Sequence, residues 1–212
     1  DFIQRMMADE IQLLILGFLF IATGLVPLLV FIRKPEKKIY FAFGFFALSI
    51  GMATLGEAED LLQLFWGLPT VLFFVLLIFY FLTPVGLCMY FEQIFGPGFK
   101  SGIRRLWQIH LGYAVLCSVI LILNVFPVSY LEIFSILYFM LFFFTLLVLL
   151  GTCLVSAIRG RTDARIITAG FAIFWGLGIY DILGRGLNLI PSWSGVTYPW
   201  GMLIFILSLG FV

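Results

Sequence analysis

Charged residues are scarce in this 212-residue chain. Asp, Glu, Lys and Arg make up 11% of it, whereas 63% of the residues are hydrophobic. Soluble domains carry about a quarter of charged residues, so these side chains offer too little polar surface to cover a water-soluble globule. The composition therefore excludes a water-soluble globular protein. We expect most of the chain to be surrounded by the lipid bilayer.

The sequence also lacks the residues that several kinds of binding site need. With a net charge of +1 and no basic stripe carrying interleaved aromatics, it offers nothing that would recruit nucleic acid. It has one histidine, and its three cysteines, Cys88, Cys117 and Cys153, stand singly in apolar runs without Cys-x-x-Cys spacing. We therefore expect no disulfide framework, no metal site and no cofactor.

What the chain does contain is apolar runs of membrane-spanning length. A bilayer core of about 30 Å requires roughly 20 apolar residues per helix, and seven such runs lie between charged breaks. They predict an all-α, polytopic bundle of seven transmembrane helices that forms one domain over residues 1–212. The predicted spans are residues 13–32, 39–56, 66–91, 106–125, 133–158, 166–190 and 195–212.

The basic residues predict the orientation of this bundle. Of twelve Lys and Arg residues, four follow the first span, three the third and three the fifth. The positive-inside rule places these three loops in the cytoplasm, so the N-terminus lies outside and the C-terminus inside. The sequence thus predicts a multi-pass membrane protein with three basic loops in the cytoplasm.

The two ends of the sequence suggest that it is part of something longer. It begins at Asp1 without an initiator Met or signal peptide, although its N-terminus is expected outside, and it stops within the last predicted helix. We therefore expect the chain to be the membrane portion of a protein with further domains upstream and downstream.

Ionisable residues within a membrane span are costly and are functional candidates by default. Asp181 and Arg185 lie at i and i+4 in the sixth predicted helix, close to its outer end, with Asn188 at i+7 and with Gly170 and Gly178 on the same side. This polar stripe could bind a ligand or pass a signal. It could equally be an ion pair that satisfies itself and holds the sixth helix to a neighbour.

Two further polar groups are candidates. At the outer junction of the second and third spans, Glu57 leads an acidic group that could meet Arg185 or could simply cap the next helix. On the cytoplasmic side, Glu92, Arg104, Arg105 and His110 lie close together in sequence. Because histidine titrates near neutrality, His110 could sense pH, although a hydrogen bond near the headgroups would also explain it.

The chain lacks the residues that several known activities of membrane proteins require. All four lysines lie in predicted cytoplasmic loops, which excludes a retinal Schiff base in the last helix. One histidine is too few for a zinc hydrolase, and Asp181 has no second intramembrane aspartate for an aspartate protease. We expect no catalysis from this chain, and any enzymatic activity would belong to a separate cytoplasmic domain.

The pattern of residues along the chain resembles that of a known protein family. The basic loop after the first span leads into the aromatic and small-residue segment 39–52, with the sequence IYFAFGFFALSIGM. This arrangement, and the hydropathy and loop charges of the remaining chain, are similar to those of the bacterial seven-transmembrane receptors with diverse intracellular signalling modules. The resemblance implies a location in a bacterial inner membrane. It also implies a sensing domain before the bundle and an output module after it, such as a histidine kinase, a cyclase or a phosphatase.

The sequence thus predicts a receptor module that relays an external signal to a cytoplasmic output domain, within a homodimer. A small-solute transporter, with Asp181 and Arg185 in the substrate path, is the alternative, and a purely structural anchor is a third hypothesis. The sequence identifies neither the ligand nor the output chemistry.

Overall fold

The structure, a computed structural model, describes residues 2–58, 70–123, 129–181, 183 and 197–211. These residues form seven α-helices and one short 3-10 turn, and no strand occurs among them, which confirms the all-α class. The helices are α1 (Phe2–Arg33), α2 (Lys38–Glu57), α4 (Thr70–Phe95), α5 (Gly102–Leu123), α6 (Ser129–Ile158), α7 (Thr162–Asp181) and α8 (Tyr198–Gly210).

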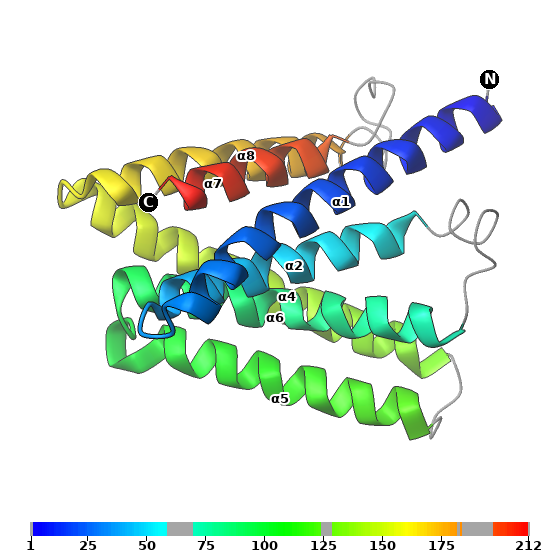
Figure 1. Ribbon diagram of the computed structural model, residues 1–212, viewed down its shortest axis with the longest axis horizontal. Helices are drawn as coiled ribbons and strands as arrows, with labels where there is room; N and C mark the ends of the chain where they lie inside the picture. Colours follow the sequence, from blue (N-terminus) through cyan, green and yellow to red (C-terminus); the bar gives the residue numbers. More distant parts are fainter. Residues whose placement is uncertain (1, 59–69, 124–128, 182, 184–196, 212) are drawn as a thin grey trace.

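The helices run side by side along the long axis of the molecule (Figure 1). One group packs in the order α5, α4, α2, α1, and the other in the order α6, α7, α8. The groups meet where α6 contacts α4 and α5 and where α8 contacts α1 and α2. The α1–α2, α4–α5 and α6–α7 connections lie at one end of the bundle, together with the C-terminus, and the N-terminus lies at the other (Figure 1). Because these three connections carry most of the basic residues, we call this end the basic end.

Four helical segments are long and apolar enough to cross a membrane. They are Met7–Arg33, Lys38–Glu57, Phe74–Phe95 and Ile136–Ile158, and the shorter apolar helix Tyr198–Gly210 accompanies them in the described part of the chain. Helix α1 begins at Phe2, well before the first predicted span, because a helix can continue past the bilayer boundary. Most of the predicted sixth span beyond Asp181 lies outside the described residues.

Helices α1 and α2 touch through glycines. Gly17 and Gly24 of α1 and Gly44 and Gly51 of α2 are each seven residues apart, so each pair lies on one helix face. A Cβ at Gly24 would lie 2.8 Å from the Gly44 carbonyl oxygen, and one at Gly51 would lie 2.8 Å from that of Gly17. The two backbones therefore approach as closely as small residues allow in membrane helices.

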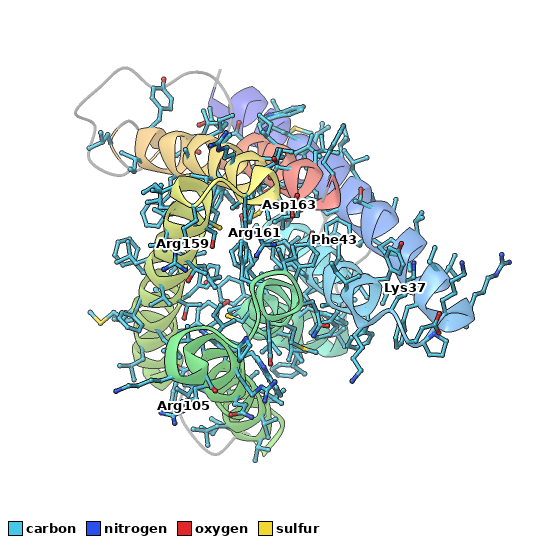
Figure 2. All side chains as sticks on the ribbon, turned by 90° about the vertical axis from the view of Figure 1, so that its left-hand side faces the viewer. Lys37, Phe43, Arg105, Arg159, Arg161 and Asp163 are labelled. Atoms are coloured by element: carbon cyan, nitrogen blue, oxygen red, sulfur yellow. The ribbon has the colours of Figure 1, made fainter. Side chains whose placement is uncertain are left out.

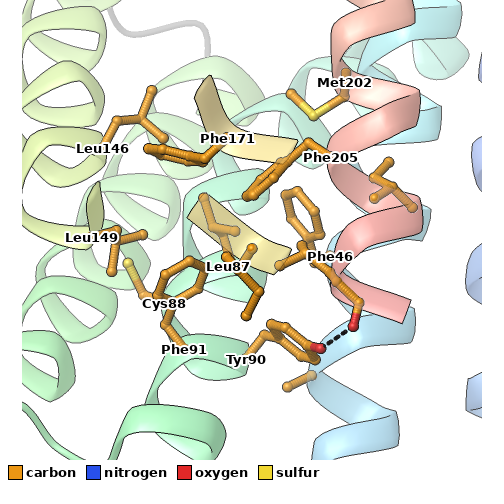
Figure 3. Close-up of a cluster of buried hydrophobic side chains, with 14 of the residues drawn as sticks. Phe46, Leu87, Cys88, Tyr90, Phe91, Leu146, Leu149, Phe171, Met202 and Phe205 are labelled. Atoms are coloured by element: carbon orange, nitrogen blue, oxygen red, sulfur yellow. Dashed lines mark hydrogen bonds between the residues drawn. The ribbon is translucent and has the colours of Figure 1, made fainter. Parts of the chain in front are cut away.

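A central apolar cluster joins the two groups of helices. Phe46 of α2, Phe91 of α4, Leu149 of α6, Phe171 of α7 and Phe205 of α8 are all buried in it. Figure 3 shows these side chains meeting between the helices. The Phe171 and Phe205 rings lie 4.8 Å apart, centroid to centroid, so α7 and α8 share an aromatic contact at the centre of the bundle.

Candidate functional site

The carboxylate of Asp181 caps the first turn of α8. Asp181 is the last residue of α7, and its Oδ2 accepts hydrogen bonds from the backbone N–H groups of Thr197, at 2.8 Å, and of Tyr198, at 2.6 Å. Its Oδ1 accepts a third, at 2.8 Å, from the Thr197 hydroxyl. The end of α7 is thus tied directly to the start of α8.

A second carboxylate reaches the same turn from another helix. Glu57, the last residue of α2, accepts a hydrogen bond at Oε2 from the phenol of Tyr198. Tyr198 therefore contacts two acids, one through its backbone and one through its side chain. We call Glu57, Asp181, Thr197 and Tyr198 the N-terminal clamp of α8.

The clamp fits the electrostatics of a helix start. The first N–H groups of a helix have no partner within it, and the aligned peptide dipoles place partial positive charge there. Thr197 occupies the N-cap position but makes no capping hydrogen bond to α8 itself, so Asp181 supplies the acceptors instead. Where water is scarce, unpaired backbone donors are expensive, so the clamp fixes where α8 begins.

The structure connects two of the candidates that the sequence indicates. Asp181 and Glu57 converge through Tyr198, whereas Arg185 and Asn188 lie outside the described residues. Gly170 packs against α8, because a Cβ there would lie 2.7 Å from the Ser208 Cβ. Gly178 has no neighbouring atom within 4 Å of its Cβ position in the described part of the chain.

Open space beside Gly178 belongs to a cavity between α6, α7 and α8. The cavity holds about 330 Å³, within the range of small-molecule sites. Its walls are almost entirely apolar, with Phe143 of α6 and Trp175 of α7 in T-shaped ring contact at 5.2 Å. Asp181 and Tyr198 also line it, so an apolar occupant would touch two members of the clamp.

The other end of α8 is also held by a side chain. The phenol of Tyr90, from α4, donates a hydrogen bond to the backbone carbonyl of Leu209 in the last turn of α8. Figure 3 marks this bond below the central cluster. Both residues are buried. Helix α8 is thus fixed at its start by α2 and α7 and near its end by α4.

A polar cluster at the basic end contains two of the cytoplasmic-side candidates. The Glu92 carboxylate accepts a hydrogen bond from Arg104 Nε at 2.6 Å and from Trp107 Nε1 at 2.7 Å, which joins the ends of α4 and α5. Arg105, the next residue of α5, is exposed at the same end of the bundle (Figure 2). The pairing of Glu92 with Arg104 fits their closeness in sequence, whereas Trp107 is a partner that the charge pattern did not indicate.

A second arginine contact links the α6–α7 connection to α4. The Arg161 guanidinium donates to the Ile94 carbonyl at 3.3 Å and lies 5.1 Å from the centroid of the Phe95 ring. Its charge thus meets the carbonyl end of a helix, where cations are favourable. From the sequence, Arg161 was informative only as one of the basic residues that predict the orientation of the bundle.

His110 lies inside the bundle, with 1% of its surface exposed. Its Nε2 lies 2.9 Å from the Thr145 hydroxyl of α6, and that hydroxyl donates its one proton to the Leu141 carbonyl. With the Thr145 proton on the Leu141 carbonyl, the contact to His110 requires the tautomer that carries its proton on Nε2. Nδ1 has no hydrogen-bond partner in the described part of the chain. His110 thus ties α5 to α6.

No three His, Cys, Asp or Glu side chains in the described ranges lie close enough together to hold a metal ion. The clamp residues that sequence reasoning missed, Thr197 and the backbone of Tyr198, did carry a signal. A threonine two residues before Pro199 is typical of a helix N-cap, because proline favours the first helical turn.

The chain matches the profile of a known family. The profile of a family described as 7TM diverse intracellular signalling matches residues 9–212, which is nearly the whole chain. This confirms the resemblance inferred from the sequence. No curated protein and no solved structure matches the chain.

Proposed function

The chain belongs to the 7TM diverse intracellular signalling family, and we propose that it relays an external signal to a cytoplasmic output domain through a displacement of α8. Membership makes it a multi-pass membrane domain of a signalling family. The relay, the output domain, the inner-membrane location and the homodimer are parts of the proposal. Any catalysis would belong to the output domain.

We propose seven spans, with the basic end in the cytoplasm. The α1–α2, α4–α5 and α6–α7 connections lie together at that end with the C-terminus, which supports the positive-inside assignment (Figure 1). Single cysteines introduced at Lys100 and at Glu57 would test it in intact cells, after replacement of the native cysteines. An impermeant thiol reagent should label the Glu57→Cys variant and spare the Lys100→Cys variant. The reverse labelling would overturn the orientation.

The observation that carries the relay is the fixation of α8 at both ends by other helices. Asp181 of α7 and Glu57 of α2 hold its start, and Tyr90 of α4 holds its end. A shift of α7 or α2 would change the clamp and favour a second position of α8, as expected for two discrete packing arrangements. Helix α8 ends at the basic end, where a cytoplasmic domain would receive the displacement.

The cavity between α6, α7 and α8 offers one place where a signal could act. An occupant would contact Asp181 and Tyr198 and would therefore interact differently with the two positions of α8. Such a difference in affinity is what a ligand needs to shift a conformational equilibrium. Movement of an upstream domain could act on α8 itself through α1, which contacts it.

The relay is tested in a full-length receptor with a measurable output. Replacement of the bundle by an unrelated single-span anchor should abolish regulation, and Asp181→Ala should change the basal output while leaving the protein in the membrane. Normal regulation by the anchor chimera would refute the relay. Solute uptake into proteoliposomes containing the bundle alone, if lost in the Asp181→Asn variant, would favour the transporter instead.

A further inference from the structure

A groove lies beside the C-terminal end of α8, away from the clamp. It runs between α1, α2 and α8 and has a volume of about 480 Å³. Val26 and Val30 of α1, Ile39 and Phe43 of α2, and Leu209 of α8 form much of its apolar wall. Its volume suits a small molecule or part of a larger one.

The groove opens toward the outside of the bundle along α1. Val26, at its rim, has 63% of its surface exposed. A smaller hollow of about 220 Å³ shares Val26 and Val30 and continues to Arg33, the last residue of α1. Apolar surface therefore leads without interruption from the groove to the first cation of the α1–α2 connection.

Positive charge collects where the groove ends. Segment 33–38 carries four basic residues and one acid, and all of its residues are exposed. The Lys37 ammonium lies 5.8 Å from the centroid of the Tyr40 ring, and Tyr40 itself lines the groove. Figure 2 shows Lys37 on the periphery of the basic end, with Phe43 nearer the centre.

We propose that this groove binds an anionic phospholipid, with an acyl chain against α1, α2 and α8 and with the phosphate against segment 33–38. An apolar channel next to a cluster of cations complements an amphiphile with a negative head. Basic pockets between transmembrane helices, at the cytoplasmic surface of a bilayer, bind the headgroups of anionic lipids. The apolar walls distinguish this site from one for free phosphate, which would gain nothing from them.

The bound lipid would contact the end of α8. Leu209 both lines the groove and accepts the hydrogen bond from Tyr90, so occupancy affects the residue that fixes that end. Lipid composition would then tune the position of α8. This consequence rests on the proposed relay, whereas lipid binding does not, so the two are tested by different measurements.

The binding experiment uses the whole chain in nonionic detergent, titrated with phosphatidylglycerol or phosphatidylcholine and observed by native mass spectrometry. The wild type should retain a phosphatidylglycerol adduct at lipid concentrations that give no phosphatidylcholine adduct. Each basic residue near a headgroup contributes about fivefold in affinity, so Arg33→Gln/Lys37→Gln should weaken binding by about thirtyfold. Val26→Trp fills the rim and should weaken it independently of charge.

The matched control is Arg105→Gln/Arg159→Gln, which removes the same charge from the same end at exposed positions away from the groove. It should leave the adduct nearly unchanged. An equal loss in this control, or equal retention of phosphatidylcholine, would overturn the site. Displacement of the lipid by an equal concentration of glycerol phosphate would assign the cations to free phosphate. A lipid-free dimer that Val26→Trp dissociates would assign the groove to a second copy of the chain.

Discussion

Helices α1 and α2 and helices α7 and α8 form two antiparallel pairs that pack through glycine in different ways. In the α1–α2 pair, Gly24 and Gly51 face backbone atoms of the partner helix. In the α7–α8 pair one glycine also meets backbone, since a Cβ at Gly201 would lie 2.9 Å from the Phe174 Cα. Gly170, however, faces the side chain of Ser208, and a cavity opens beside Gly178. A side chain can rotate away from an approaching atom, whereas a backbone cannot.

The polar contacts differ in the same sense. The start of α8 depends on hydrogen bonds to Asp181 and Glu57, which are directional and can be exchanged for others. The glycine contacts of α1 and α2 allow no such exchange, because close-packed interfaces tolerate little change in volume. The α1–α2 pair is therefore suited to be a fixed frame. The α7–α8 pair has exchangeable hydrogen bonds at the start of α8 and a cavity beside Gly178, so it is suited to be the part that moves.

The largest expected effect is on the frame. Gly24→Leu would push a side chain into the α2 backbone, 2.7 Å from the Leu48 nitrogen, and should cost about 3 kcal/mol or more of stability. Thermal unfolding in detergent measures it. Gly112→Leu is the control, because Gly112 is exposed in α5 and no atom of the described residues lies within 4 Å of its Cβ position. Equal losses in both variants would mean that glycine packing does not hold α1 to α2.

A smaller difference is expected within α7. Gly170→Ala places a methyl group 2.7 Å from the Ser208 Cβ and should cost about 1–3 kcal/mol, less if Ser208 rotates. Gly178→Ala enters open space and should be neutral or slightly stabilising, since alanine favours helices. The same unfolding assay compares them. Equal melting temperatures for the two variants would contradict close packing of α7 on α8.

Loss of the cap comes next. Asp181→Ala removes the acceptors for three hydrogen bonds and should cost about 1–2 kcal/mol, as other N-cap losses do. Hydrogen exchange should accelerate at the Thr197 and Tyr198 amides in particular. Asp181→Asn keeps one acceptor oxygen and should lie between wild type and Asp181→Ala. Unchanged exchange at these two amides would exclude the clamp.

The second acid of the clamp is tested by coupling. Tyr198→Phe and Glu57→Ala each remove one partner of the same hydrogen bond, so their effects should not add. A double-mutant cycle should give an interaction of about 0.5–1.5 kcal/mol, the usual range for one hydrogen bond. Strict additivity would show that the two side chains act separately.

The smallest effect is expected at Arg104. Its ion pair with Glu92 is exposed on one side only, with 54% of the Arg104 side chain but 11% of the Glu92 side chain exposed, and Trp107 still donates to Glu92 when Arg104 is replaced. Ion pairs near the surface contribute about 0–1 kcal/mol, so Arg104→Gln should hardly change the free energy of unfolding. The change should be smaller still in high salt, which screens the pair. A loss as large as that of Asp181→Ala would indicate that this end of the bundle is as tightly determined as the clamp.

Much of this architecture can be predicted from short segments of the sequence. Apolar runs and charged breaks predict helices because burial in lipid acts on each segment separately. The sequence also shows that Gly17 and Gly24, and likewise Gly44 and Gly51, are seven residues apart. Only the structure shows that the two pairs of glycines face each other. Asp181 could be selected because an acid within a span is costly and needs a partner.

The partners themselves were harder to predict. The i+4 rule directs attention from Asp181 to Arg185, whereas its described partners, Thr197 and Tyr198, follow after a further connection. Tyr90 bonds to a carbonyl 119 residues away, a contact that depends on how α4 and α8 pack. Local rules contain no information on such pairings, because the neighbour of each helix is determined by the whole bundle.

The relay is tested most directly by a distance measured at the basic end. Spin labels at Arg159→Cys and Phe211→Cys, with the three buried native cysteines replaced, report the position of α8 against the α6–α7 connection. Asp181 lies at the far end of α8, a helix about 20 Å long. We predict that Asp181→Ala shifts or broadens this distance distribution, whereas Gly178→Ala preserves it. An unchanged distribution in the folded Asp181→Ala variant would contradict the proposal that α8 carries the signal.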